Sequence, residues 1–229
     1  MLLTNTLAET IFISFSYFYL IGNTIDYILL RSNIIKKPFG LKSAIISLLH
    51  SIVTSYHGIK YFYNYDLSLV HYNKDDIQVI HNIIIFSLGY FVQDFYYALK
   101  NKSFTIADYI HHSWVLAFGY IILPYPIRYK MVVFANLTEI SSIFYNLGYI
   151  ISIFYGKNSN LYLNNCAIFA VTFFLIRIVL FPFICIYNIN DEAITSYSYF
   201  KFFIPIIILL NIWWFRQIYY KCISLILDK

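Results

Sequence analysis

The sequence is poor in charged residues, which make up only 12% of its 229 positions, whereas hydrophobic residues make up 60% and the mean hydropathy is +0.66. Soluble globular domains carry about 25% charged residues, so this composition excludes that class. Cysteine is scarce as well: Cys166, Cys185 and Cys222 are an odd number without the spacing of a metal site. We interpret them as packing residues and expect neither a metal nor a cofactor.

The formal net charge of +5 is not concentrated in one place, because the basic residues are scattered over short connecting segments. A nucleic-acid-binding protein would gather them on one face, so we expect no nucleic-acid partner. Basic residues in short loops are instead typical of an integral membrane protein, where they mark the cytosolic side.

Apolar runs of about 20 residues, the length that crosses a hydrocarbon core of about 30 Å, recur along the chain. They predict an all-α, polytopic membrane protein with about seven transmembrane helices. The predicted spans are residues 7–30, 42–63, 77–99, 108–123, 129–153, 164–187 and 199–223. Pro124 should end the fourth span, and Pro182 and Pro205 should kink or break the last two. With the N-terminus outside, the inner loops carry about twice as many Lys and Arg residues as the outer ones, which predicts a cytosolic C-terminus.

Two adjacent histidines, His111 and His112, stand near the start of the fourth span, three and four positions after Asp108. A charge in mid-helix costs about 2.5–3.5 kcal/mol on membrane-insertion scales, so we expect the pair to face a protein interior or a wet cavity. On a helix, the Asp108 carboxylate would be close enough to hold a ring N–H and bias that imidazole towards accepting a proton. The pair indicates a buried polar site; the alternative is that the rings only satisfy each other or water.

Polar side chains in the second and third spans point to the same region. His50, Thr54 and His57 share one helical face, which should look inward either as a hydrogen-bonding seam or as part of a site. Asp94 lies near the end of the third span, and the short connection that follows predicts that the third and fourth spans are neighbours. Asp94 should therefore lie at the depth of the His pair, as a site residue or as a helix-end polar residue.

The fifth span carries a polar stripe of Glu139, Ser142 and Asn146. A glutamate at mid-membrane should not face lipid. Arg177 is the only basic residue deep in the sixth span, so Glu139 either forms a structural ion pair with Arg177 or belongs to the site.

Four segments in this order resemble the TLC domain family: Ser47-Leu-Leu-His50, Gly89-Tyr-Phe-Val-Gln-Asp94, Asp108-Tyr-Ile-His111-His112 and Glu139-Ile-Ser-Ser-Ile-Phe-Tyr-Asn146. The resemblance covers roughly residues 40–225. It implies that residues 39–229 form a six-helix membrane domain around a cavity for a long acyl chain, preceded by an N-terminal transmembrane helix and cytosolic connection in residues 1–38. In the ceramide synthases of this family, the pair matched by His111 and His112 serves acyl transfer from acyl-CoA to a sphingoid amine.

The sequence departs from the synthase pattern in the fifth span. Synthases carry a His-Asp and a second Asp there, whereas residues 135–146 keep a single acidic residue, Glu139. The sequence is more similar to the non-synthase members, which are tied to membrane lipid composition. We therefore expect a protein that binds membrane lipids or acyl chains and influences lipid composition, and not a di-iron hydroxylase, which needs more than the six histidines present.

The alternative hypothesis is an acyl-CoA-dependent acyltransferase of the ceramide synthase type. One histidine would act as base or acyl carrier while a carboxylate sets the tautomer of the other and Glu139 orients the amine. The candidate catalytic residues are His111, His112, Asp94, Asp108 and Glu139.

Lipid binding would add polar groups around the head of the ligand. The candidates for this role are His50, Ser142, Asn146 and Arg177. Their depths predict one cavity that opens to the cytosol beside the His pair and narrows past Glu139. The expected location is an endomembrane such as the endoplasmic reticulum, or a host membrane for a viral protein.

The orientation can be tested at Asn101-Lys-Ser103, an acceptor motif for N-glycosylation. The predicted topology places this motif in a cytosolic loop, so gel-shift analysis of ER-expressed protein, with and without glycosidase, should show no glycan at Asn101. A glycan there would mean that the orientation is inverted. Asn136-Leu-Thr138 lies inside a span, is expected to stay unmodified in either orientation, and so is no control.

Overall fold

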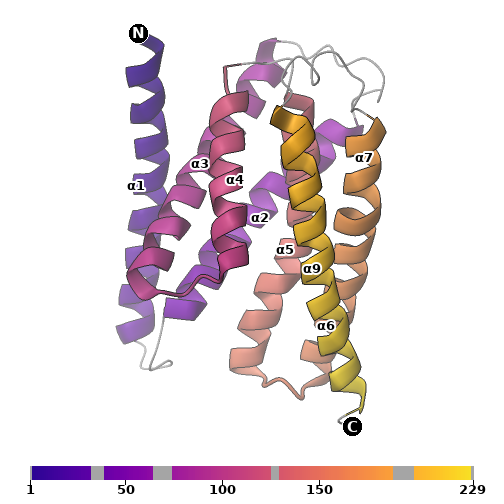
Figure 1. The fold of residues 1–229 in the computed structure, drawn as a ribbon. Coiled ribbons are helices and arrows are strands. Elements are labelled where there is room, and N and C mark those ends of the chain that lie inside the picture. Colours follow the sequence, from indigo (N-terminus) through magenta and orange to yellow (C-terminus); the bar gives the residue numbers. More distant parts are fainter. Residues whose placement is uncertain (1, 32–38, 64–73, 125–128, 188–198, 228–229) are drawn as a thin grey trace. The chain divides into compact units, whose positions relative to one another are not determined.

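The computed structural model describes residues 2–31, 39–63, 74–124, 129–187 and 199–227, and within these ranges the chain is helical without any strand (Figure 1). Seven long helices result in the described ranges. They are α1 (Leu2–Arg31), α2 (Phe39–Tyr63), α3 (Lys74–Asn101), α4 (Ile106–Ile122), α5 (Tyr129–Phe154), the continuous run of α6 (Asn160–Phe173), η2 (Phe174–Leu180) and α7 (Phe181–Tyr187), and α9 (Tyr199–Leu227).

Each predicted span overlaps one of these helices, which confirms the all-α class. Two segments, Met131–Phe154 and Asn160–Ile186, are long and apolar enough to cross a membrane by length and composition. Membrane crossing by the other helices stays a prediction. The predicted domain boundary after residue 38 also stays a prediction, and it lies outside the described residues.

The prolines act differently in the three places where the sequence singled them out. α4 ends at Ile122, just before Pro124, as predicted. α9 continues through Pro205, so of the two predicted effects the break does not occur and the kink stays a prediction. Membrane helices tolerate an internal proline where neighbouring groups satisfy the freed carbonyl. Pro182 follows a seven-residue π-helical stretch, Phe174–Leu180, which absorbs the lost backbone bond without ending the helix.

The described chain forms two compact units, and α2 contributes to both. Unit 1 contains Met1–His50 and Tyr63–Val132. In it α1 and α4 both pack against α3. Its core is aromatic and aliphatic, with the buried residues Phe18, Ile46, Tyr90 and Phe91 at its centre.

Unit 2 contains Ser51–Phe62 and Val133–Lys229. α6 and η2 pack against α9 within it, and Phe134, Leu137 and Ile184 form a buried cluster. Gly58 lets α2 approach α5 closely, since an added Cβ would lie 3.0 Å from the backbone nitrogen of Leu137. This close approach of the two helices lets polar side chains of α2 reach those of α5.

A second close approach holds α1 against α3 at Gly89. A Cβ at this position would overlap the Ser14 side chain and lie 2.7 Å from the backbone nitrogen of Phe15. The Ser14 hydroxyl donates to the Phe86 carbonyl one turn earlier on α3, at 3.3 Å. Only glycine fits between the two backbones here.

We expect Gly89→Ala to destabilise unit 1, because backbone atoms of α1 cannot rotate away from the added methyl group; overpacking of this kind costs about 1–3 kcal/mol. The thermal unfolding midpoint of the detergent-purified protein should fall. Gly119→Ala is the matched control, since its Cβ meets only the flexible Leu88 side chain, at 2.8 Å. Equal midpoints for Gly89→Ala and the unmodified protein would show that α1 is not held at this distance.

Candidate functional site

The carboxylate–histidine cluster joins three helices of unit 1 through Ser43, Asp94 and His112. His112 Nε2 lies 2.9 Å from Asp94 Oδ2, and Ser43 on α2 donates to Asp94 Oδ1 at 3.5 Å. The predicted neighbourhood of Asp94 and the His pair is thus confirmed for His112. Both side chains are largely buried, with 11% of His112 and 17% of Asp94 exposed.

The second ring nitrogen of His112 is engaged as well. Nδ1 lies 2.9 Å from the backbone carbonyl oxygen of Asp108, one turn earlier on α4. A carbonyl oxygen only accepts hydrogen bonds, so Nδ1 carries the proton and donates. A single further proton then lies between His112 Nε2 and the Asp94 carboxylate, which makes the pair a hydrogen-bonded unit with no ring nitrogen left over.

The Asp108 carboxylate has a different role from the predicted one. Its Oδ2 accepts from the Thr105 backbone nitrogen at 2.8 Å and from the Thr105 hydroxyl at 2.7 Å, forming a capping box at the start of α4. The predicted contact of this carboxylate with an imidazole is therefore wrong, because two unsatisfied donors at the helix start lie closer to it. Asp108 reaches His112 only through its backbone.

His111 is less buried than its neighbour. Its ring lies edge-on to the His112 ring, with centroids 5.4 Å apart, and 6.1 Å from the Phe91 ring. Phe104 and Phe91 cover the His112 ring at 4.3 and 5.2 Å. Aromatic side chains thus shield His112 from solvent, whereas His111 lies at the edge of the cluster.

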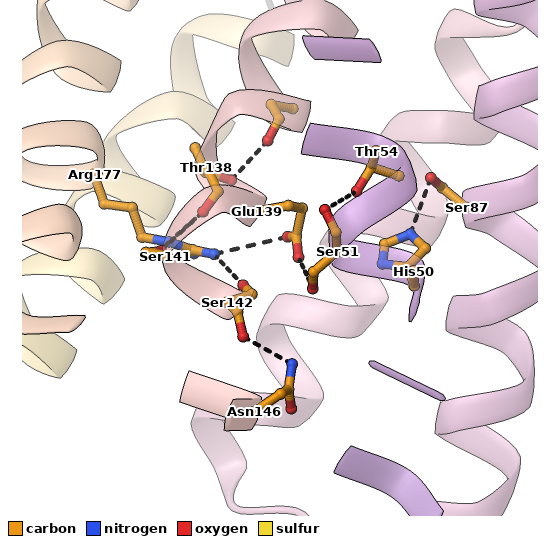
Figure 2. Close-up of polar contacts among 11 residues, drawn as sticks. His50, Ser51, Thr54, Ser87, Thr138, Glu139, Ser141, Ser142, Asn146 and Arg177 are labelled. Atoms are coloured by element: carbon orange, nitrogen blue, oxygen red, sulfur yellow. Dashed lines mark hydrogen bonds and ion pairs between the residues drawn. The ribbon is translucent and has the colours of Figure 1, made fainter. Parts of the chain in front are cut away.

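His50, also in unit 1, is buried with 1% of its surface exposed. Its Nε2 lies 3.1 Å from the Ser87 hydroxyl on α3, and its ring stacks on Tyr90 with centroids 4.0 Å apart (Figure 2). Thr54, on the same face of α2, is fully buried and donates to the Ser51 carbonyl at 3.3 Å. The prediction that this face looks inward is confirmed for these two residues.

The arginine–glutamate cluster belongs to unit 2 and centres on Arg177, in the π-helical segment η2 (Figure 2). Arg177 Nε donates to Ser141 Oγ at 2.8 Å and to the Thr138 carbonyl at 3.2 Å, and Nη2 donates to Ser142 Oγ at 3.0 Å. The Arg177 side chain thus binds polar groups of Thr138, Ser141 and Ser142, all on α5.

Glu139 completes this cluster from α5. Its Oε1 lies 3.7 Å from Arg177 Nη2, and its Oε2 accepts from the Ser51 hydroxyl on α2 at 3.1 Å (Figure 2). The structure therefore contains the ion pair that the sequence offered as one reading of Glu139. Arg177 is 7% exposed, so this ion pair is buried inside an apolar bundle.

Asn146 continues the α5 stripe and is buried, but its amide nitrogen donates to the Ser142 carbonyl on its own helix at 2.8 Å. Asp94, His111 and His112 lie in unit 1, whereas Glu139 and Arg177 lie in unit 2. A single cavity shared by these residues stays a prediction. Within the described residues, no group of three His, Cys, Asp or Glu side chains suits a metal ion.

Most of the serines that complete these clusters were not predicted from the sequence. Ser43 lies seven positions before His50 and so on the same face of α2, a spacing that would have revealed it. Ser141 stands in the polar run of α5 without belonging to the predicted stripe. Ser51 and Ser87 carried no signal, because a lone serine in an apolar helix has many possible partners.

Comparison with known protein families finds one match: the model of the TLC domain matches residues 41–220. These residues include α2 to α7 and most of α9, and leave out α1. Comparison with curated proteins and with solved structures finds no match for the chain.

Arg177→Leu should lower the thermal unfolding midpoint, because it leaves the Glu139 carboxylate buried with only the Ser51 hydroxyl. Removing one partner of a buried pair costs about 3–5 kcal/mol in soluble proteins, and hydrogen bonds in membranes are weaker, at about 0.6 kcal/mol on average. Adding Glu139→Gln should recover much of the loss. Arg216→Leu, the same change at an exposed arginine, should have little effect. Strictly additive shifts of the two single changes would show that Glu139 and Arg177 do not interact.

Proposed function

Since the chain belongs to the TLC domain family, and is therefore a membrane protein, we propose that it binds membrane lipids or acyl chains and so influences the lipid composition of its membrane. We further propose seven membrane crossings, an N-terminus outside or in the lumen, a cytosolic C-terminus and a location in an endomembrane such as the endoplasmic reticulum. Polar side chains of the carboxylate–histidine cluster would contact the lipid head while apolar helix faces hold the chain.

We favour lipid binding over catalysis because both ring nitrogens of His112 already have hydrogen-bond partners. A histidine that acts as nucleophile or general base needs a ring nitrogen within reach of the substrate. In His112 one nitrogen donates to the Asp108 carbonyl and the other contacts Asp94. The arrangement suits a fixed polar wall better than a proton acceptor.

The surroundings of Glu139 support the same choice. An acceptor amine is oriented or deprotonated best by a carboxylate whose charge no cation already neutralises. Glu139 faces Arg177 with one oxygen and accepts from Ser51 with the other. Together with the loss of the synthase His-Asp pattern in residues 135–146, this favours a structural ion pair beside a lipid.

An acyl-CoA-dependent acyltransferase remains the second candidate function, and His111 is the residue that favours it. Its ring is partly exposed and lies 5.4 Å from His112. In that mechanism His111 would accept the acyl group or the amine proton, and the Asp94–His112 pair would orient it. Acyl-CoA would then be a partner in addition to membrane lipid.

We expect acyl lipid to co-purify with the protein in nanodiscs and to be seen by native mass spectrometry. His111→Ala should weaken binding about two- to tenfold, the loss of one net hydrogen bond of about 0.5–1.5 kcal/mol. His81→Ala, a partly exposed histidine outside both clusters, is the matched control. The same nanodiscs with labelled acyl-CoA and long-chain amines should form no amide.

Amide formation that disappears in His111→Ala and His112→Ala, but not in His81→Ala, would overturn the binding proposal in favour of the acyltransferase. Absence of any co-purified or exchangeable acyl lipid from the unmodified protein would contradict both candidate functions.

A further inference from the structure

We propose that Asp26, on the N-terminal helix outside the matched TLC domain, is a positioning residue for the Asp94–His112 pair. It would hold the Lys42 ammonium group away from Asp94 and so leave that carboxylate to His112. This inference deepens the proposed function, since it concerns the same polar cluster, but it depends only on contacts within unit 1.

Lys42 is a charged side chain in the interior of unit 1, with only 4% of its surface exposed. Its ammonium forms an ion pair with the Asp26 carboxylate of α1. It also lies 4.0 Å from the centroid of the Tyr97 ring on α3, and the Tyr97 hydroxyl donates to Asn23 Oδ1 on α1 at 3.3 Å. A buried ammonium needs a negative partner, and α1 supplies it.

The carboxylate of Asp94 is the competing partner. Asp94 precedes Tyr97 by three positions, so both side chains leave the same face of α3 with Cβ atoms about 5–6 Å apart. Ser43, the residue next to Lys42, already donates to Asp94 Oδ1. Lys42 and Ser43 are consecutive on α2 and contact Tyr97 and Asp94, which are three positions apart on α3. Asp94 is therefore the carboxylate that we propose the flexible lysine stem would reach next.

Removal of the Asp26 charge would change the balance between these partners. An ammonium that loses its anion inside an apolar bundle turns to the next carboxylate within reach, which is Asp94. A carboxylate neutralised by lysine is a poorer partner for His112 Nε2, so the His112 ring would be released from α3.

Contacts along α1 keep Asp26 in place for this role. The Gly89 approach fixes the middle of α1 on α3, and the Tyr19 ring stacks on the Tyr97 ring with centroids 6.1 Å apart. The matched domain begins at residue 41 and includes Lys42 but not its counter-ion. The N-terminal helix thus supplies the counter-ion of Lys42 from outside the matched domain.

The test measures the reaction of each histidine with diethylpyrocarbonate in full-length protein in nanodiscs, read by peptide mass spectrometry. A hydrogen-bonded ring nitrogen reacts slowly, and Asp94→Ala, which leaves no polar atom to hold the ring, gives the rate of a released His112. We expect Asp26→Asn to raise the His112 rate on the order of tenfold, the loss of a hydrogen bond to a charged group. In the double variant Asp26→Asn with Lys42→Met, the rate should return to that of the unmodified protein, because no ammonium competes for Asp94.

His81, on the same helix α3, is the internal control and should react at one rate in all variants. An unchanged His112 rate in Asp26→Asn, or in Asp94→Ala, would overturn the proposal. So would a double variant as reactive as Asp26→Asn alone, or a parallel rise at His81, since both mean that α1 was merely loosened. Lipid is not needed for this readout, so failure of lipid binding would leave the result on Asp26 standing.

Discussion

A charged group inside an apolar helix bundle needs a partner of opposite charge, because neither water nor lipid offers one. The described charged residues with little exposure obey this constraint: Lys42 meets Asp26, and Arg177 meets Glu139 and the α5 serines. Each of these contacts joins two different helices, α1 with α2 and α5 with the helical run that contains η2. In an apolar chain such contacts specify which helix faces meet, a choice that apolar packing alone leaves open.

The two clusters use the constraint in different ways. In the arginine–glutamate cluster, Arg177 donates its hydrogen bonds to hydroxyl and carbonyl oxygens of α5. The carboxylate–histidine cluster depends on one shared proton between Asp94 and His112. The arginine–glutamate cluster therefore holds its helices together. The carboxylate–histidine cluster is sensitive to nearby charge, and for this reason the position of the Lys42 ammonium is important to it.

The sequence was sufficient to predict the helices and several of the pairs, but not the rotations of individual side chains. The lengths of the apolar runs and the positions of the prolines predicted all seven helices. The similar membrane depth of Asp94 and the His pair predicted that Asp94 lies near His112. Depth and helical spacing do not rank competing partners, so the capping pattern Thr105-Ile-Ala-Asp108 was overlooked although it is visible in the sequence. The ion pair of Lys42 with Asp26 depends on how α1 is rotated against α2, and no local pattern encodes that rotation.

The π-helical stretch that carries Arg177 is an α-helix with one residue inserted. One extra residue turns everything that follows by about 100° around the helix axis. The faces of α6 and α7 are therefore set independently, although they form one continuous rod. A lineage that lost a single codon between residues 174 and 180 would keep the length of the helix almost unchanged and would still rotate one half of it out of phase with its neighbours.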